Sequence, residues 1–442
     1  MKPNRYNIGM KKWLAFLIIF VPSYVLSADT VHSVTAQTTR MAPQTLIKRF
    51  KLKPGDLFTE QEYQKAQEEL HKLRVFKTLE FIEQKRKEGV DIHIKADDRS
   101  YVFPMAFALS GKKRSAGLSV ASGNLFKQGE SAYFFVGGGR DGFDTHGALV
   151  WGDHTFFAGY SHINFEQSFY ENGWMSVPSI FSSADDRNKH NDSLLQTVHG
   201  KQDDLVFTYR RKIARWWSVS VTPQYEYYNY KGGVLDSGNH SHVTFGLQYA
   251  EDIRPGMNMG ALAGIGLSDK KHALQNLPRV RTGKLADISY TLGGHFTGSD
   301  YNIQKVSLSG TYLWEFKTRH MLAVFAKAQR AIEAPFSNQI ESSDLLFGMG
   351  IYDREQRGKK GVSAGVSFNY FILRNNLGLL SFMPFYEQAY ISLGGNSYQP
   401  HSGVGAVLSY RFWRFPLPVG VSFTHNLNDG SHHLGFKVGG KF

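Results

Sequence analysis

The chain has 442 residues, of which 44 are glycine and 14% are aromatic, and it contains no cysteine. Without cysteine, it can form neither disulfide bonds nor a cysteine-linked lipid anchor. The formal net charge of +13 is compatible with nucleic acid, anionic lipid or simple solubility, so the charge by itself selects no partner. Many aromatic and glycine residues at a mean hydropathy of −0.33 favour β structure over a helical bundle.

The first 28 residues have the three parts of a secretory signal peptide. A basic stretch, 1–12, precedes a short apolar run, 13–26, and small residues follow it. The apolar run contains Pro22 and is shorter than the ~20 residues of a transmembrane helix. The sequence therefore predicts a signal peptide over 1–28, and an exported protein is not expected to bind nucleic acid.

Residues 29–98 predict a small α/β domain with the order β-α-α-β-β. Thr59 and Glu62 form a capping box, in which each side chain bonds a free backbone N–H at the start of a helix. Apolar residues then recur at helical spacing. The predicted elements are a strand over 31–37, a helix over 44–50, a longer helix after Thr59, and strands over 76–84 and 90–96.

This module resembles a polypeptide-transport-associated (POTRA) domain. A small α/β domain of another kind is the alternative. POTRA domains characteristically precede an outer-membrane barrel, and the remaining residues can test this expectation. The resemblance rests on a set of short motifs: Leu52-Lys53-Pro54-Gly55-Asp56, Phe58-Thr59, Leu70-x-x-Leu73, Val75-Phe76 and Gly89-Val90-Asp91-Ile92.

From residue 101 to residue 442, apolar residues alternate with small or polar residues at a period of two. The clearest stretch is 361–372, and similar stretches occur at 306–314, 404–412 and 419–425. Amphipathic segments of about ten residues between turns are the signature of a transmembrane β-barrel, which closes so that every backbone N–H and C=O in the membrane is paired. The pattern predicts a transmembrane antiparallel β-barrel of about 16 strands. A soluble β-sandwich or propeller is the alternative.

A POTRA-like module followed by such a barrel resembles the BamA/TamA superfamily of outer-membrane insertases and translocases. Five of the sixteen strands in that superfamily follow a long sixth loop that folds into the barrel, and here five predicted strands follow the loop 331–359. The stretch Asn124-Leu125-Phe126-x-x-Gly129 is similar to the family's turn after its second strand. The opening of the loop is similar at Phe347, Gly348 and Gly350.

The same resemblance implies an ion pair between the loop and the barrel lumen. Arg357 and Gly358 match the Arg-Gly of the family's Val-Arg-Gly-Phe/Tyr tip, although its Val and its aromatic residue are absent. Phe385-x-Glu387-x-Ala389 stands where the family has Phe-x-Asp-x-Gly. Arg357 is therefore expected to pair with Glu387, because a guanidinium offers two donors to a carboxylate. A solvated loop arginine and an unrelated lumenal glutamate are the alternative.

The chain ends on an alternating stretch, 431–442, whose last residue is aromatic. This ending is similar to the C-terminal signal by which outer-membrane barrels are recognised for assembly. The resemblance further implies that this last strand meets the first barrel strand, 103–110, in a weak seam. The alternating positions of the last strand are Leu434, Phe436, Val438, Gly440 and Phe442.

Three motifs suggest chemistry, but none has the context that the chemistry needs. Gly361-x-Ser363-x-Gly365 matches the nucleophile elbow of hydrolases, which requires a strand–turn–helix bend, yet it lies inside a predicted strand. The pairs His432-His433 and His240-x-His242 have no further ligands at metal-binding spacing. We therefore predict no catalytic, cofactor or metal site.

These features together predict an outer-membrane protein of a Gram-negative bacterium, with the POTRA-like domain in the periplasm. The expected function is the insertion of proteins into the outer membrane, or the translocation of polypeptides across it, without a cofactor. The expected partners are outer-membrane lipid or lipopolysaccharide and unfolded polypeptide clients, with periplasmic accessory proteins as further candidates. A passive channel with a vestigial POTRA domain and, less favoured, an outer-membrane hydrolase are the alternatives.

Overall fold

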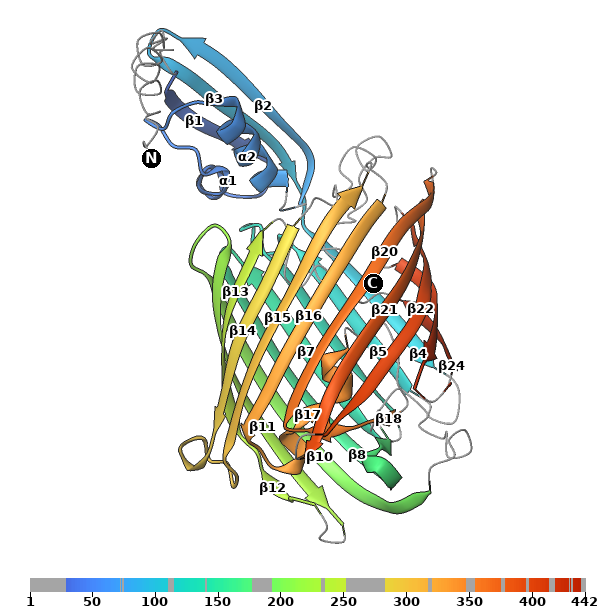
Figure 1. The fold of residues 1–442 in the computed structure, drawn as a ribbon. Coiled ribbons are helices and arrows are strands. Elements are labelled where there is room, and N and C mark those ends of the chain that lie inside the picture. Colours follow the sequence, from blue (N-terminus) through green and yellow to red (C-terminus); the bar gives the residue numbers. More distant parts are fainter. Residues whose placement is uncertain are drawn as a thin grey trace, which may run out of the picture. The chain divides into compact units, whose positions relative to one another are not determined.

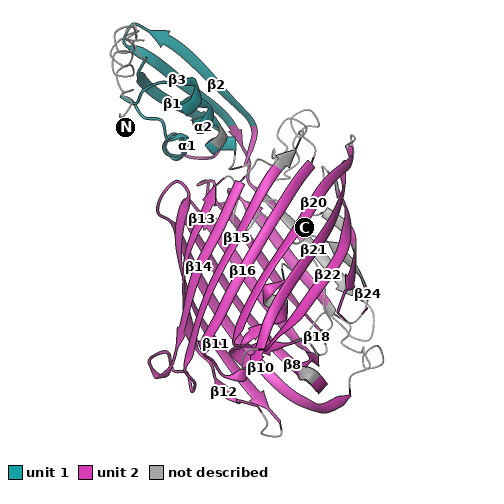
Figure 2. Cartoon of the chain, in the orientation of Figure 1, with its two compact units in different colours: residues 1–38, 43–72, 78–96 teal, residues 39–42, 73–77, 97–442 magenta. Residues whose placement is uncertain are grey.

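The computed structural model describes residues 29–71, 73, 75–109, 115–139, 141–176, 193–231, 235–251, 283–316, 320–346, 354–374, 378–394, 397–412, 418–428, 430 and 432–438. The predicted signal peptide, 1–28, lies outside these residues. The chain divides into two compact units, which Figure 2 shows in different colours. The first unit comprises 1–38, 43–72 and 78–96, and the second comprises 39–42, 73–77 and 97–442.

The first unit is a three-stranded sheet with two helices, in the predicted order β-α-α-β-β (Figure 1). The strand order across the sheet is β1-β3-β2, and β1 runs parallel to β3. Both helices pack on one residue of β2, because the rings of Phe50 and Tyr63 contact the ring of Phe81. The elements are β1 (Val31–Thr38), α1 (Pro43–Phe50), α2 (Glu60–His71), β2 (Phe76–Arg86) and β3 (Gly89–Asp98).

The second helix begins where the capping residues predict. The Thr59 hydroxyl accepts the backbone N–H of Glu62 at 3.2 Å, which satisfies one donor of the first helical turn. The residues that recur at helical spacing, Tyr63, Ala66 and Leu70, are all buried. This apolar stripe and the inward residues of β3 form the core of the unit, since burial of apolar side chains is the main driving force for folding.

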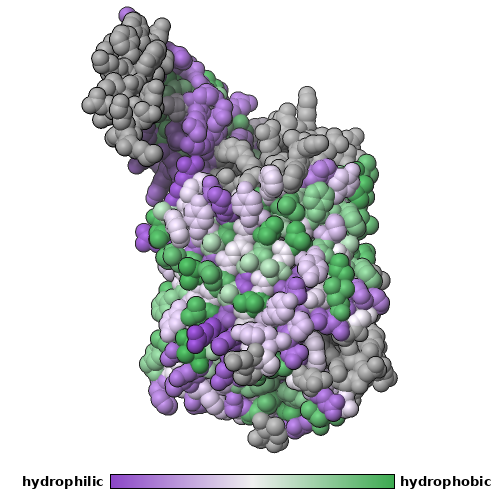
Figure 3. All heavy atoms as spheres, viewed as in Figure 1, coloured by the Kyte–Doolittle hydropathy of each residue, from purple (hydrophilic) through white to green (hydrophobic). Residues whose placement is uncertain are grey.

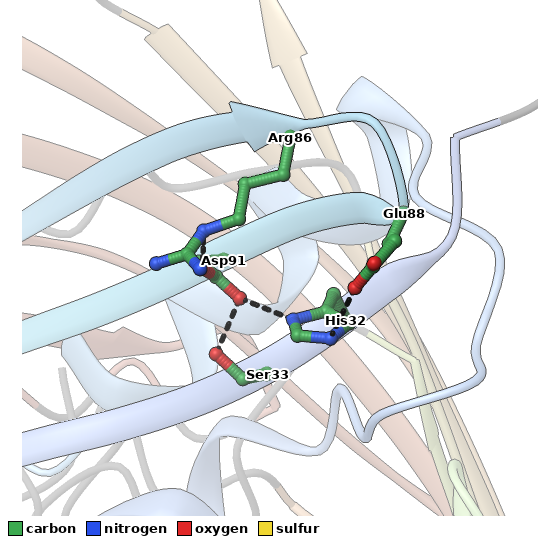
Figure 4. A network of polar contacts seen from close by, with 5 residues as sticks. All are labelled: His32, Ser33, Arg86, Glu88 and Asp91. Atoms are coloured by element: carbon green, nitrogen blue, oxygen red, sulfur yellow. Dashed lines mark hydrogen bonds and ion pairs between the residues drawn. The ribbon is translucent and has the colours of Figure 1, made fainter.

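A polar network on the sheet joins β1 to β3 (Figure 4). Asp91 accepts hydrogen bonds from the Ser33 hydroxyl at 2.5 Å and lies 2.8 Å from His32 Nδ1. Arg86 Nε lies 2.5 Å from the same carboxylate, and Glu88 reaches the other nitrogen of His32. The hydrogen bond from Ser33, followed by that from His32, holds the pKa of Asp91 below its usual value, because both favour the charged carboxylate.

The second unit contains sixteen long strands among the described residues, as predicted, and each registered neighbouring pair is antiparallel. Figure 1 shows them as a barrel wall. The short strands β9 (Met175–Ser176), β12 (Gly238–Asn239) and β18 (Arg354–Glu355) extend the same sheet. The long strands are β4 (Tyr101–Leu109), β5 (Ser115–Gly123), β6 (Ser131–Gly139), β7 (Gly142–Trp151), β8 (His154–Tyr170), β10 (Leu194–Lys212), β11 (Trp217–Tyr230), β13 (His242–Glu251), β14 (Gly283–Gly293), β15 (Ile303–Phe316), β16 (His320–Glu333), β20 (Lys360–Arg374), β21 (Gly378–Gly394), β22 (Ser397–Phe412), β23 (Pro418–Asn426) and β24 (His432–Val438).

The sheet order places the last strand beside the first. β24 pairs with β23 over seven residues and stands next to β4 in the order of the sheet. Within the described part of the chain, residue registers join consecutive long strands from β4–β5 through β8–β10 and β16–β20 to β23–β24. The sheet closes where β24 and β4 are neighbours.

The wall is apolar outside and polar or small inside, as the period-two pattern predicts. In β20, the side chains of Val362, Phe368 and Ile372 are exposed, whereas those of Ser363 and Ser367 are buried. Figure 3 shows apolar side chains over the visible part of the wall. None of the described helices is long and apolar enough to cross a membrane.

The turn after the second barrel strand is tightly hydrogen-bonded. Asn124, which follows β5, has a φ of +55° and is fully buried. Its side chain donates to Asp98 at 2.9 Å and accepts the N–H of Gly129 at 3.0 Å. Glu130 accepts the N–H groups of Phe126 and Gln128, at 2.7 and 3.1 Å. These bonds explain why the predicted turn motif contains an Asn, which tolerates a positive φ.

Candidate functional site

The segment 334–359 connects β16 to β20, and its described residues, 334–346 and 354–359, lie inside the barrel. Its described parts are a 3₁₀ turn (Phe336–Asn338), β17 (Ile340–Glu341), α5 (Ser342–Leu345), β18, and β19 (Arg357–Gly358). β17 pairs with β19, so the two ends of the segment form a small two-stranded sheet of their own. The predicted opening of the loop at Phe347, Gly348 and Gly350 lies outside the described residues. We call 334–359 the inner loop.

Arg357 contacts other residues of the inner loop and so links its two ends. Its side chain is 8% exposed, and its Nη2 lies 2.6 Å from Glu341 Oε1, directly across the β17–β19 pair. Its Nη1 donates to the carbonyl oxygen of Ser337 at 3.1 Å, and its guanidinium lies 5.5 Å from the centre of the Phe336 ring. One guanidinium therefore holds three separate parts of the loop in one conformation.

The other predicted members of the site lie on β21. Glu387 is fully buried, and its strand neighbours are Gly365 on β20 and Gly403 on β22. Phe385 is buried in a cluster with residues of β21 and β22. Glu341 supplies one carboxylate that pairs with Arg357. A direct pair between Arg357 and Glu387 stays a prediction.

The inner loop packs against one side of the wall through apolar contacts. Ile340, Leu345 and Leu346 form a buried cluster with Ala389 and Ile391 of β21. Their burial removes apolar surface from the water of the lumen, which stabilises the docked loop.

Gly358 brings the loop backbone directly onto this wall. A Cβ atom at this position would overlap the carbonyl oxygen of Ser392 and stand 2.9 Å from Ile391 Cγ1. The adjacent Lys359 N–H donates to the same Ser392 carbonyl at 3.2 Å. Glycine is therefore required here for the close approach of two backbones.

Polar contacts attach the loop to the opposite side of the wall. Asn338 donates to Glu226 Oε2 at 2.6 Å and hydrogen-bonds to the Nδ1 of His240 through its oxygen. The hydroxyl groups of Ser337 and Tyr230 are 2.9 Å apart. Since Glu226 and Tyr230 belong to β11, the loop reaches from β21 to β11 and crosses the lumen at this level.

Ser363 and His240, which belong to two of the motifs discussed above, hydrogen-bond to the inner loop. Ser363 lies in the unbroken strand β20, and its hydroxyl donates to the carbonyl oxygen of Leu345 at 2.5 Å. His240 also hydrogen-bonds through Nε2 to the carbonyl of Asp236, at 3.2 Å, so both of its ring nitrogens have partners. Among the described residues, no group of three or more His, Asp or Glu side chains is placed to bind a metal ion.

Two further contacts fix the end of the loop nearest β20. His401 of β22 and Gln356 form a buried hydrogen bond of 2.8 Å. β18 pairs with β9, which adds a short strand interaction between the loop and the segment after β8. The loop is thus attached to β9, β11, β20, β21 and β22.

The last strand occupies the predicted position in the wall. Leu434, Phe436 and Val438 stand opposite Phe423, Val421 and Val419 in the β23–β24 register. Gly440 and Phe442 lie outside the described residues.

Several residues of the site escaped the sequence analysis. Glu341, Asn338 and Glu226 belong to no motif, and the motif that contains His240 did not indicate a contact with the loop. Their contacts join residues that are 16 to 112 positions apart. The sequence does show that Glu341 is an acidic residue on the same loop as Arg357. It does not show which acidic side chain lies next to Arg357, because that depends on how the loop folds.

Solved structures share this barrel. CdiB from Escherichia coli aligns with a TM-score of 0.58 at 12% identity, covering 93% of this chain and 74% of that one. CdiB from Acinetobacter baumannii aligns with a TM-score of 0.55 at the same identity and coverage. BamA from Haemophilus ducreyi lacking POTRA domains 1–3 aligns with a TM-score of 0.49 at 12% identity, over 93% of this chain and 82% of that chain.

No protein-family model matches the chain, and no curated protein matches its sequence. At 12% identity, the likeness to CdiB shows the fold. The barrel that the predicted resemblance implies is therefore confirmed at the level of the fold.

Proposed function

We propose that this protein assists the insertion of polypeptides into the outer membrane, or their translocation across it, through a barrel that opens between β24 and β4. The observation that carries the proposal is a lumen crossed by a docked loop, which an open channel does not need. The first unit is proposed to act as a POTRA domain in the periplasm, and residues 1–28 as the signal peptide for export.

The order of the strands supports the position of the opening. β4 and β24 are the first and last strands of the wall, and they are neighbours in the sheet. A client strand could therefore enter between them without separating the two strands of any hairpin.

The inner loop supports transport of polypeptide over passive diffusion. It is fastened at both sides of the lumen and is held in one conformation by Arg357. A pore for small solutes gains nothing from such an obstruction. A client strand that pairs with an open edge of the wall, by contrast, satisfies backbone groups that would be costly to leave unpaired in the membrane.

The first unit offers an edge for a client strand. β2 is an edge of the three-stranded sheet, and most of its residues are exposed. The other edge, β1, is partly occupied, because Val31 exchanges backbone hydrogen bonds with Gly55 and Asp56. An extended polypeptide could therefore add to β2 by β-augmentation. Polypeptide clients and outer-membrane lipid are the partners of the proposed function, and periplasmic accessory proteins are further candidates.

A disulfide lock tests the opening. Because the chain has no cysteine, a pair introduced into β4 and β24 would be the only thiols. We expect the oxidised protein to lose its assistance to the folding of an outer-membrane client in liposomes, and reduction to restore it. A pair placed across β14 and β15, which are joined along eleven residues, is the matched control and should leave activity unchanged.

Two results would contradict the proposal. Full activity of the oxidised β4–β24 protein would exclude lateral opening as the mechanism. Steady conductance in planar bilayers without any effect on client folding would favour the passive channel.

A further inference from the structure

Two histidine rings face each other across the hairpin of β23 and β24. His425 and His432 stand opposite each other in the antiparallel register. Their ring centres are 4.5 Å apart, and their Nδ1 atoms are 3.0 Å apart. The two residues are seven positions apart in the chain, so the motif His432-His433 gave no sign of this pairing.

The pair lies on the outward side of the wall, at the end of the hairpin next to its loop. Val421 and Phe423, which precede His425 at a period of two, are exposed, whereas Thr424 is buried. The ring of His432 also stacks on Phe423, with 5.7 Å between the ring centres. His432 is exposed and His425 is partly exposed, so an ion can reach both rings from outside the barrel.

We propose that His425 and His432 bind a late first-row divalent cation, such as Zn²⁺ or Cu²⁺, through their Nδ1 atoms. Imidazole is a preferred ligand of these ions. Two nitrogens at 2.0–2.1 Å from a tetrahedral Zn²⁺ are separated by about 3.3 Å. The observed separation of 3.0 Å is close to this value. The rings now stack with 23° between their planes, so binding also requires them to turn until both Nδ1 lone pairs point at the ion.

The protonation of the pair is compatible with this role. In the present contact, one Nδ1 must carry a hydrogen, since the other is an acceptor. If that ring moves its hydrogen to Nε2, both Nδ1 atoms present lone pairs while both rings stay neutral. The cation then replaces a hydrogen bond without a net loss of protons, and water fills its remaining coordination positions.

A bound cation would fasten the loop end of β24 to β23. A ligand that binds the paired hairpin but not the separated strands stabilises the pairing by mass action. Because β24 is the strand next to β4, the ion would hold one side of the closure in place. The metal site does not depend on the proposed transport function.

The test uses the full chain in detergent, purified without a polyhistidine tag. Titration with Cu²⁺ followed by electron paramagnetic resonance reads the nitrogen ligands directly, and Zn²⁺ calorimetry gives the affinity. We expect a site with two equatorial imidazole nitrogens, whose affinity falls at least ~tenfold in His425→Phe and in His432→Phe. Phenylalanine keeps an aromatic ring in the stack and removes only the ligand.

A matched control is His320→Phe. His320 also lies in a ring stack on the wall, 4.5 Å from Tyr370, but its partner is not a histidine. This variant should bind both ions as the unchanged protein does. Hydrogen exchange of the β24 amides should slow on addition of Zn²⁺, and this slowing should be absent in His425→Phe.

Wild-type affinity in both His425→Phe and His432→Phe would overturn the proposal. So would a copper spectrum with a single nitrogen ligand, or the absence of binding to the unchanged protein.

Discussion

At the scale of single residues, Arg357 contacts three separate parts of the inner loop. Its guanidinium joins Glu341, the Ser337 carbonyl and the Phe336 ring. A charge removed from water is stable only when its hydrogen bonds are made, so each partner constrains where the loop can lie.

Replacement of Arg357 by alanine should therefore free the inner loop. The change leaves Glu341 without its ion pair, and we expect a loss of about 2 kcal/mol, since Glu341 keeps some access to water. The thermal unfolding midpoint should fall, and protease should cut within 334–359 faster than in the unchanged protein. Arg330→Ala is the control, because Arg330 is exposed on β16. Equal protection of the loop in the two variants would contradict this role.

At the scale of elements, one carboxylate links all three strands of the sheet in the first unit. Asp91 of β3 contacts His32 and Ser33 on β1 and Arg86 on β2. These contacts lower the pKa of Asp91, with the Ser33 hydrogen bond as the largest cause. A lowered carboxyl pKa contributes stability above the pKa of the unfolded chain, and this contribution is lost as the pH falls through the lower, folded value.

The pairing of β1 with β3 should consequently weaken in acid. We expect hydrogen exchange of the β1 amides, corrected for intrinsic rates, to lose protection as the pH falls below about 4, near the pKa of a free aspartate. Asp91→Asn should remove this part of the pH dependence. Glu80→Gln, which changes an exposed carboxyl on β2, should keep it. Identical pH profiles for Asp91→Asn and the unchanged protein would show that another group is responsible.

At the scale of the whole molecule, the inner loop is expected to limit the opening of the barrel. Sixteen strands enclose a wide lumen, and the loop crosses it from the apolar cluster at β21 to the polar contacts at β11. The docked position depends on the close approach of Gly358 to Ser392. A change at this one position should therefore alter a property of the entire barrel.

Gly358→Ala should raise the conductance of the protein in planar bilayers. The new methyl group would overlap the Ser392 carbonyl, so the loop would have to leave the wall. Gly310→Ala on β15 is the matched control, because its Cβ would lie 3.8 Å from the nearest atom, the Leu285 carbonyl oxygen. Conductance that is equal in the two variants would show that the loop does not limit the flow of ions.

The sequence by itself determined that a small α/β unit precedes a β-barrel, because local residue patterns control the formation of helices and strands. Helical spacing after Thr59 predicted α2, and a period of two predicted strands such as β20. The alternation also told which face of each strand is apolar, since a strand in a membrane must turn one face to lipid. The five strands after the inner loop were placed for the same reason.

Only the tertiary structure decided which side chains meet inside the barrel. Arg357 pairs with Glu341 of its own loop, and the loop contacts Glu226 and His240 through Asn338. It also brought His425 to His432. Periodicity assigns a residue to a face of a strand, but contacts across a lumen or a hairpin depend on register and on the path of the loop. Those are fixed by the packing of the whole chain.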